Sequence, residues 1–130
     1  MATKSKGNYV DGFVLTVDKK KLGIYKKMAA GMAKLTKKYG ALDYKECVGE
    51  DMNPKGMGGM KFLTFPELAK PKKGEVVVFS YIVYKSRKHR DQVNANMMKD
   101  PIMNDPKWKN MPMPFDMKRM AYGGFTVLVG

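Results

Sequence analysis

The chain has 130 residues, 44% of them hydrophobic, and this length suits a single domain with a buried core. No apolar run approaches the roughly 20 residues that a membrane span needs, and the first ten residues lack the apolar stretch of a signal peptide, so we expect a soluble cytoplasmic protein without a membrane partner. The net charge of +13 raises the question of a polyanionic partner, but nearly all of the 25 basic residues are lysines, so solvated lysines that aid solubility are the simpler interpretation.

The first part of the chain predicts a strand, a helix and a second strand. Residues 9–17 are rich in β-branched and aromatic residues and are apolar in both alternating positions, which is typical of a central strand. Apolar residues then recur every three or four positions over residues 22–39, with Asp18 as a candidate N-cap, Gly40 as a C-terminal stop and lysines on the opposite face. This pattern predicts an amphipathic helix. The more polar residues 41–49 predict an edge strand.

The middle of the chain predicts a long connection, a strand and a helix. Residues 50–74 hold several glycines and prolines around the string FLTF, which indicates a connection with one short extra strand. Residues 75–84 are apolar on both faces and predict a second central strand. Ser86 is a candidate N-cap for a helix that runs to about Lys99, with an inward stripe that starts at His89 or Arg90.

The last part of the chain predicts a packed loop and a final strand. Residues 100–116 contain four prolines among apolar side chains, so we expect a packed loop without regular elements. Residues 118–129 form the expected last strand, which contains Gly123 and Gly124. Since no helix N-terminus follows this pair, a phosphate-binding loop is disfavoured. Glycines inside a strand instead indicate a bulge, a bend or a close approach of another group to the backbone.

The order strand, helix, strand, strand, helix, strand predicts an α+β fold of the ferredoxin-like βαββαβ type. In that fold the first and third strands are central and the other two lie at the edges, as the polarity of the strands also indicates. Two helices would cover one face of the sheet and leave an apolar face open, so we expect a homodimer in which two sheets face each other as an α/β barrel. The single domain spans residues 1–130, with residues 1–7 as a flexible tail.

Neither metal binding nor nucleophilic chemistry is favoured by the sequence. His89 and Cys47 are the one histidine and the one cysteine of the chain, so an ordinary zinc site is excluded and we expect no metal and no cofactor. A catalytic pair of the two is disfavoured because they fall in a helix and an edge strand, and a buried thiol is the simpler expectation. The 13 methionines are better explained as gap-filling core residues than as a copper site.

Polar side chains at five positions are candidates for lining a cavity or binding a ligand. An acidic residue inside a central strand must find a partner or shift its pKa, and this applies to Asp11. His89 could move a proton near neutral pH, or be a helix-end histidine. Tyr44 and Glu46 share one face of their strand, and Arg119 precedes the final glycines; each of these could line a cavity or pair on the surface.

Four strings carry a resemblance to a known family: YVDGFVL, ALDYKECVGED, VVVFSYIVYKSRKHRDQVN and MPFDMKRMAYGGFTVLV. Read together, they resemble the YbaA-like family of small bacterial proteins of unknown function, and the match covers most of the chain from Tyr9 onward. The resemblance implies a dimeric α/β barrel with a ferredoxin-like monomer and implies no established activity. MNPKGMGGMKF departs from the family pattern. The wider superfamily includes cofactor-independent monooxygenases and haem-degrading proteins, and the position of His89 is reminiscent of a haem ligand there.

Three functions follow as hypotheses. The first is a homodimer that binds a small organic molecule in a cavity between sheet and helices, with oxygenase-like chemistry as one further step. The second is RNA or DNA binding by the lysine-rich first helix, with Lys26, Lys27 and Lys34 as contacts. The third is a structural or regulatory dimer without a ligand. Whether the protein is an enzyme is left open by the sequence.

Overall fold

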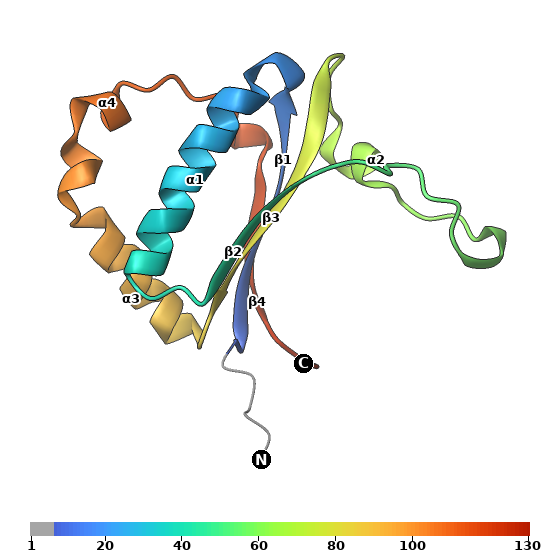
Figure 1. Ribbon diagram of the computed structural model, residues 1–130. Coiled ribbons are helices and arrows are strands. Elements are labelled where there is room, and N and C mark those ends of the chain that lie inside the picture. The colour runs from blue at the N-terminus through green and yellow to red at the C-terminus, as the bar shows by residue number, and fades with distance from the viewer. Residues whose placement is uncertain (1–6) are drawn as a thin grey trace.

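The computed structural model describes residues 7–130, in which helices pack on a four-stranded antiparallel sheet (Figure 1). The predicted flexible tail, except for Gly7, lies outside the described residues. The strands are β1 (Tyr9–Asp18), β2 (Asp43–Val48), β3 (Glu75–Tyr84) and β4 (Ala121–Thr126). The α-helices are α1 (Leu22–Lys38), α2 (Phe65–Ala69), α3 (Arg87–Met98) and α4 (Pro106–Lys109). Short 3₁₀ turns are η1 (Lys19–Lys21), η2 (Met57–Gly59), η3 (Pro101–Asn104) and η4 (Met117–Arg119).

The strand order in the sheet is β2-β3-β1-β4, with every neighbouring pair antiparallel. The prediction that the first and third strands are central is therefore confirmed. These two strands have ten residues each and pair along their whole length, whereas the edge strands have six residues each. A strand that is apolar in both alternating positions suits a central position, because neighbouring strands on both sides shield its two faces from water better than at an edge.

The core lies between the sheet and helices α1 and α3, which cover the same face (Figure 1). Alternation along β1 points every second side chain toward the helices, beginning with Tyr9 and ending with Val17. Ser86 caps α3 by accepting a hydrogen bond from the backbone of His89, as predicted. The lysines predicted for the outer face of α1 are exposed. The buried hydrophobic residues are Tyr9, Leu15, Val17, Tyr25, Ala29, Leu35, Ala41, Val77, Val78, Ile82, Tyr84, Val93 and Met97.

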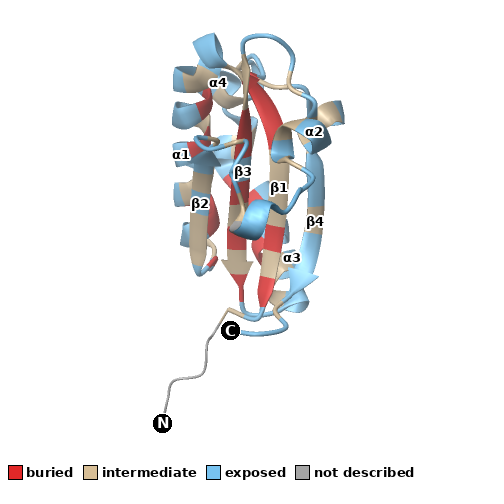
Figure 2. Cartoon of the chain, turned by 90° about the vertical axis from the view of Figure 1, so that its right-hand side faces the viewer, coloured by how far each residue is buried: buried red, intermediate tan, exposed pale blue. Residues whose placement is uncertain are grey.

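The opposite face of the sheet is only partly covered. Figure 2 shows this face with α2 in front of it, and the ring of Phe65 in α2 lies 6.4 Å from the ring of Phe79 in β3. Much of the apolar surface around α2 stays open, with Phe79 42% exposed and Phe125 61% exposed. We refer to the outward side chains of β1, β3 and β4 on this side as the open face. They include Val10, Val14, Phe79, Tyr81, Val83 and Phe125.

The two long connections differ from their predictions. FLTF does not form a strand, because Thr64 and Glu67 make a reciprocal capping box that starts α2 at Phe65. The connection between β2 and α2 projects away from the sheet on the side opposite α1 (Figure 1). Residues 100–116 contain η3 and α4, so the expectation of no regular element was wrong. Asp100 and Asp105 each cap one of these short helices, which explains why a proline-rich segment can still turn helically.

The glycine pair in β4 fits the predicted close approach of another group to the backbone, and not a bulge. β4 is shorter than predicted, but Gly123 and Gly124 pair in continuous register with Gly12 and Asp11 of β1. The buried ring of Tyr9 crosses Gly124 so closely that a Cβ atom there would lie 2.0 Å from the Tyr9 hydroxyl oxygen. Glycine at position 124 is therefore required by the packing of Tyr9.

Replacement of Gly124 by alanine should lower the free energy of unfolding by about 1–3 kcal/mol, because the new methyl group must displace the buried Tyr9 ring. Urea denaturation measures this loss. Gly23→Ala is the matched control, since a Cβ at Gly23 in α1 meets nothing within 4 Å, and it should leave stability unchanged or raise it by up to about 1 kcal/mol. Equal stability of the two variants would contradict the close-approach interpretation.

Candidate functional site

A groove of about 600 Å³ runs between α1 and the edge strand β2. Small and apolar side chains form most of its wall. Two sequence-predicted candidates, Tyr44 and Glu46, line it together with Tyr25 of α1. Its volume lies in the range of pockets that hold small organic molecules. The remaining lining residues are Leu22, Gly23, Lys26, Ala29, Ala30, Ala33, Val48 and Val78.

The carboxylate of Glu46 lies between two phenols and forms a polar patch in the wall of this groove. The hydroxyl of Tyr25 donates to Oε1 of Glu46 at 2.7 Å, and the hydroxyl of Tyr44 donates to Oε2 at 2.6 Å. Burial, followed by the hydrogen bond to Glu46, raises the pKa of both tyrosines far above its ordinary value. Both phenols therefore stay protonated at physiological pH and act as donors. We call these three residues the tyrosine–glutamate clamp.

A second, smaller cavity of about 180 Å³ lies deeper, between α1 and the sheet. All three clamp residues and Ala29 line this inner cavity as well as the groove. Ser80 lies next to Glu46 in the β2–β3 register, is buried, and also lines the inner cavity. The clamp therefore lies where the outer groove and the inner cavity meet.

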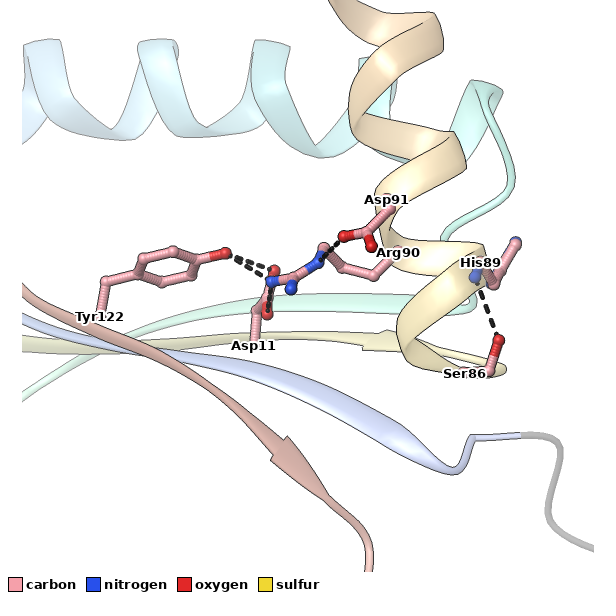
Figure 3. Close-up of polar contacts among 6 residues, drawn as sticks. All are labelled: Asp11, Ser86, His89, Arg90, Asp91 and Tyr122. Carbon is pink, nitrogen blue, oxygen red and sulfur yellow. Dashed lines mark hydrogen bonds and ion pairs between the residues drawn. The ribbon is translucent and has the colours of Figure 1, made fainter.

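Asp11 belongs to a different cluster, in which three elements meet (Figure 3). Its buried carboxylate accepts a hydrogen bond from Nη1 of Arg90 in α3 at 2.8 Å and from the hydroxyl of Tyr122 in β4 at 3.1 Å. Nη1 of Arg90 also donates to the hydroxyl oxygen of Tyr122, and its Nε donates to Asp91. The guanidinium carbon lies 5.3 Å from the ring centre of Tyr9, in a cation–π arrangement.

The electrostatics of Asp11 combine two opposing effects. Burial is the largest and raises the pKa of the Asp11 carboxyl, while the nearby charge of Arg90 and the hydrogen bonds from Tyr122 and Arg90 lower it. The outcome is a raised pKa. Both expectations for Asp11, a partner and a shifted pKa, are met. The cluster ties β1, β4 and α3 together, and its residues are not among those that line the groove.

His89 points away from the Asp11 cluster (Figure 3). Its Nδ1 accepts a hydrogen bond from the backbone N–H of Lys85, and its ring packs edge-on against Tyr84 at 5.9 Å. Burial and the charge of Lys85 lower the pKa of His89, which favours the neutral imidazole. The interpretation as a helix-end histidine agrees with these contacts.

Arg119 makes an ion pair outside the tyrosine–glutamate clamp. The guanidinium of Arg119 makes two parallel hydrogen bonds to the carboxylate of Glu75, at 2.9 and 2.8 Å, and one to the carbonyl of Lys70. This arrangement fastens the end of α2 to η4, since Lys70 caps α2.

Cys47 is exposed on β2, opposite Phe79, so the expectation of a buried thiol was wrong.

Sequence reasoning missed three residues that complete these two clusters: Tyr25, Arg90 as the partner of Asp11, and Tyr122. Tyr25 could have been found from its position on the apolar face of α1, which packs on the sheet. Arg90 was noted on the inward stripe of α3, where a guanidinium facing a buried carboxylate predicts an ion pair. Within residues 7–130 no group of three or more metal-binding side chains occurs, and no helix there is long and apolar enough to cross a membrane.

Comparison of the sequence with known proteins identifies a family. A family described as "Protein of unknown function (DUF1428)" matches residues 8–117. The chain belongs to the DUF1428 family. It is 44% identical over 121 residues to "Uncharacterized protein YbaA" of Escherichia coli (strain K12), an alignment that covers 93% of this chain and 97% of that protein. A protein with the same name in Shigella flexneri matches to the same extent.

The predicted resemblance to the YbaA-like family is thereby confirmed. The DUF1428 match includes the clamp residues, Asp11 and Arg90, and it stops before Tyr122 and β4. It also spans the projecting connection. The family description carries no activity, so a function has to be argued from the geometry of the site.

Proposed function

We propose that this protein is a homodimer that binds a small organic molecule in the groove between α1 and β2. The observation that carries the proposal is an apolar groove of about 600 Å³ with one polar anchor, the tyrosine–glutamate clamp, at its junction with a deeper cavity. Ligand sites commonly combine apolar walls with a few well-placed polar groups. We assign Glu46 a binding role, because both of its oxygens already accept hydrogen bonds from phenols.

The dimer part of the proposal rests on the open face. We infer a ferredoxin-like monomer in which the open faces of two copies meet, because the strand order β2-β3-β1-β4 leaves an apolar sheet face that α2 covers only in part. Two ion pairs on this side join charged side chains within the chain: Lys45 with Asp43, and Glu75 with Arg119. These four side chains can therefore be buried by a second copy without leaving their charges unpaired.

The distribution of charge along the chain also favours a second copy on this side. Residues 43–75, which run from β2 through the projecting connection and α2 to the first residue of β3, contain six basic and six acidic side chains and are therefore neutral. The whole net charge of +13 lies in the remaining residues, many of them exposed lysines on the outer face of α1. Contact through the neutral side keeps the two strongly basic surfaces apart.

Nucleic-acid binding is the second candidate function. The observation in its favour is that Lys26, Lys27 and Lys34 are all exposed on α1, together with the lysines of η1. A basic helix surface of this kind attracts phosphate backbones through counterion release, and such binding weakens steeply with salt.

Native mass spectrometry of the protein purified from cells is the test of the proposed function. We expect the mass of a dimer with a discrete small-molecule increment per chain. Ala33→Trp places an indole ring in the groove and should remove that increment, because Ala33 lies among the residues that form its wall. Ile24→Trp is the matched control, since Ile24 is an exposed α1 residue outside the groove lining.

The outcomes separate the candidates. A dimer without an increment, together with wild-type protein that captures no compound from a small-molecule mixture, contradicts ligand binding in the groove. Mass increments of nucleotide size that disappear at high salt favour the second candidate. Loss of the increment in both tryptophan variants would place the ligand elsewhere.

A further inference from the structure

The tyrosine–glutamate clamp offers hydrogen-bond acceptors to a ligand and no side-chain donors. Each phenol has a single hydrogen, and both hydrogens are used on Glu46. The Glu46 carboxylate has lone pairs left on each oxygen, and so does each phenol oxygen. A ligand group that faces the clamp must therefore bring its own hydrogen.

The two phenols of the clamp are protonated near neutral pH. Burial and the neighbouring carboxylate raise the pKa of Tyr25 and Tyr44, so neither phenol releases its proton there. Both oxygens of Glu46 accept a phenol hydrogen. This hydrogen-bond pattern fits the carboxylate form of Glu46, in which both oxygens are acceptors. The clamp as a unit therefore carries one negative charge.

The surroundings of the clamp favour a compact cation with an apolar body. Apart from Glu46, the one charged side chain that lines the groove is Lys26, and it is exposed to solvent. No salt bridge joins Lys26 to Glu46 in the described part of the chain. The walls are alanine, leucine and valine side chains, which suit an aromatic or alkyl body. The rings of Tyr25 and Tyr44 can add cation–π attraction.

We infer that the groove takes amphiphilic amines, meaning an aryl or alkyl body with an ammonium group that binds the tyrosine–glutamate clamp. This inference rests on the proposed function and narrows its ligand class. An ammonium group supplies both the hydrogens that the clamp lacks and a charge opposite to that of Glu46. A carboxylate or phosphate would instead bring negative charge and further acceptors to a group that has only acceptors to offer.

Three probes with one naphthalene body test the ligand class. Isothermal titration calorimetry at neutral pH compares 1-naphthylmethylamine, 1-naphthalenemethanol and 1-naphthoate on the full chain. Wild-type protein should bind the amine at least about 10-fold more tightly than the carboxylate, as expected for a charge-assisted hydrogen bond. The alcohol, which brings one hydrogen without a charge, should lie between them.

Three variants test the charge of Glu46, the charge near the groove and the location of the bound probe. Glu46→Gln keeps the shape of the side chain and an acceptor oxygen but removes its charge, so the preference for the amine over the alcohol should disappear. Lys26→Glu, an exposed substitution that does not depend on the integrity of the clamp, should raise the affinity for the amine and lower it for the carboxylate. Ala33→Trp should abolish binding of all three probes and so confirm the location.

The outcomes separate the ligand class from the proposed function. Equal binding of all three probes, abolished by Ala33→Trp, would leave a ligand-binding groove and overturn the amine class. Preference for 1-naphthoate would also overturn it and would make Lys26 the anchor. Binding of none of the probes, together with the absence of a small-molecule increment in native mass spectrometry, would overturn the proposed function as well.

Discussion

Replacement of Arg90 by methionine is expected to lower the free energy of unfolding by about 3 kcal/mol, because it leaves a buried carboxylate without its cation. The side chain of Asp11 is 3% exposed and that of Arg90 is 13% exposed. Methionine keeps much of the apolar length of arginine, so the loss reports mainly on charge and hydrogen bonding. After the substitution Asp11 retains one described donor, the hydroxyl of Tyr122. Urea denaturation followed by circular dichroism measures the change.

Lys38→Met is the matched control for this prediction. Lys38 also pairs with a buried carboxylate, that of Asp100, but its own side chain is 63% exposed. Asp100 keeps hydrogen bonds from the hydroxyl of Tyr39 and the backbone of Ile102. The loss for this variant should therefore stay below about 1 kcal/mol. Losses of similar size in the two variants would contradict a special role of the buried Asp11–Arg90 pair.

The pH dependence gives a second check on the Arg90 variant. Burial already raises the pKa of Asp11 in the folded protein, and Arg90 opposes that effect, so its removal should raise the pKa further. A folded-state pKa above the unfolded value of about 3.9 means that the folded state binds more protons in the interval between the two. Stability then falls as pH rises through this interval. The loss should be small below about pH 4 and complete near neutrality. A loss independent of pH would indicate lost packing instead.

The two polar clusters show how far the sequence could predict this site. An acidic residue in an otherwise apolar central strand was enough to require a partner for Asp11, since an isolated buried charge is too costly. The sequence could not say which partner, because Arg90 lies 79 residues away and meets Asp11 only through the packing of α3 on the sheet. Likewise, alternation placed Tyr44 and Glu46 on one face, but the register of α1 against β2 brings in Tyr25.

The fold was predictable where a hydropathy pattern extends over many residues. It was less predictable where a single N-cap determines whether a short helix forms. The ten-residue strand β3 has the predicted bounds, since residues 75–84 are apolar in both alternating positions. FLTF was misassigned because its four residues carry little periodicity, and the capping box of Thr64 and Glu67 favours a helix there. Asp100 and Asp105 act similarly in the second connection. Short capped helices depend on single side-chain hydrogen bonds, which hydropathy patterns do not register.

The substitution Phe79→Glu should convert the proposed dimer into a monomer. Phe79 lies on the central strand β3, in the open face, and is 42% exposed in the single chain. In a dimer formed by two open faces, each copy would bury a glutamate against apolar side chains of the other, without a cation to pair with it. We expect the dimer dissociation constant to rise at least about 100-fold, a cost typical of an unpaired charge at the centre of an interface. Sedimentation velocity across a concentration series measures it.

The control for this prediction is Ile24→Glu, which introduces the same charge at an exposed apolar residue of α1, on the opposite side of the molecule. It should leave the dimer intact, and a dimer that survives Phe79→Glu but not Ile24→Glu would place the interface on the helices. All residues that line the groove come from one chain and from the helix-covered side of the sheet. The monomeric Phe79→Glu variant should therefore still bind 1-naphthylmethylamine, because ligand binding and dimer formation use opposite faces of the sheet.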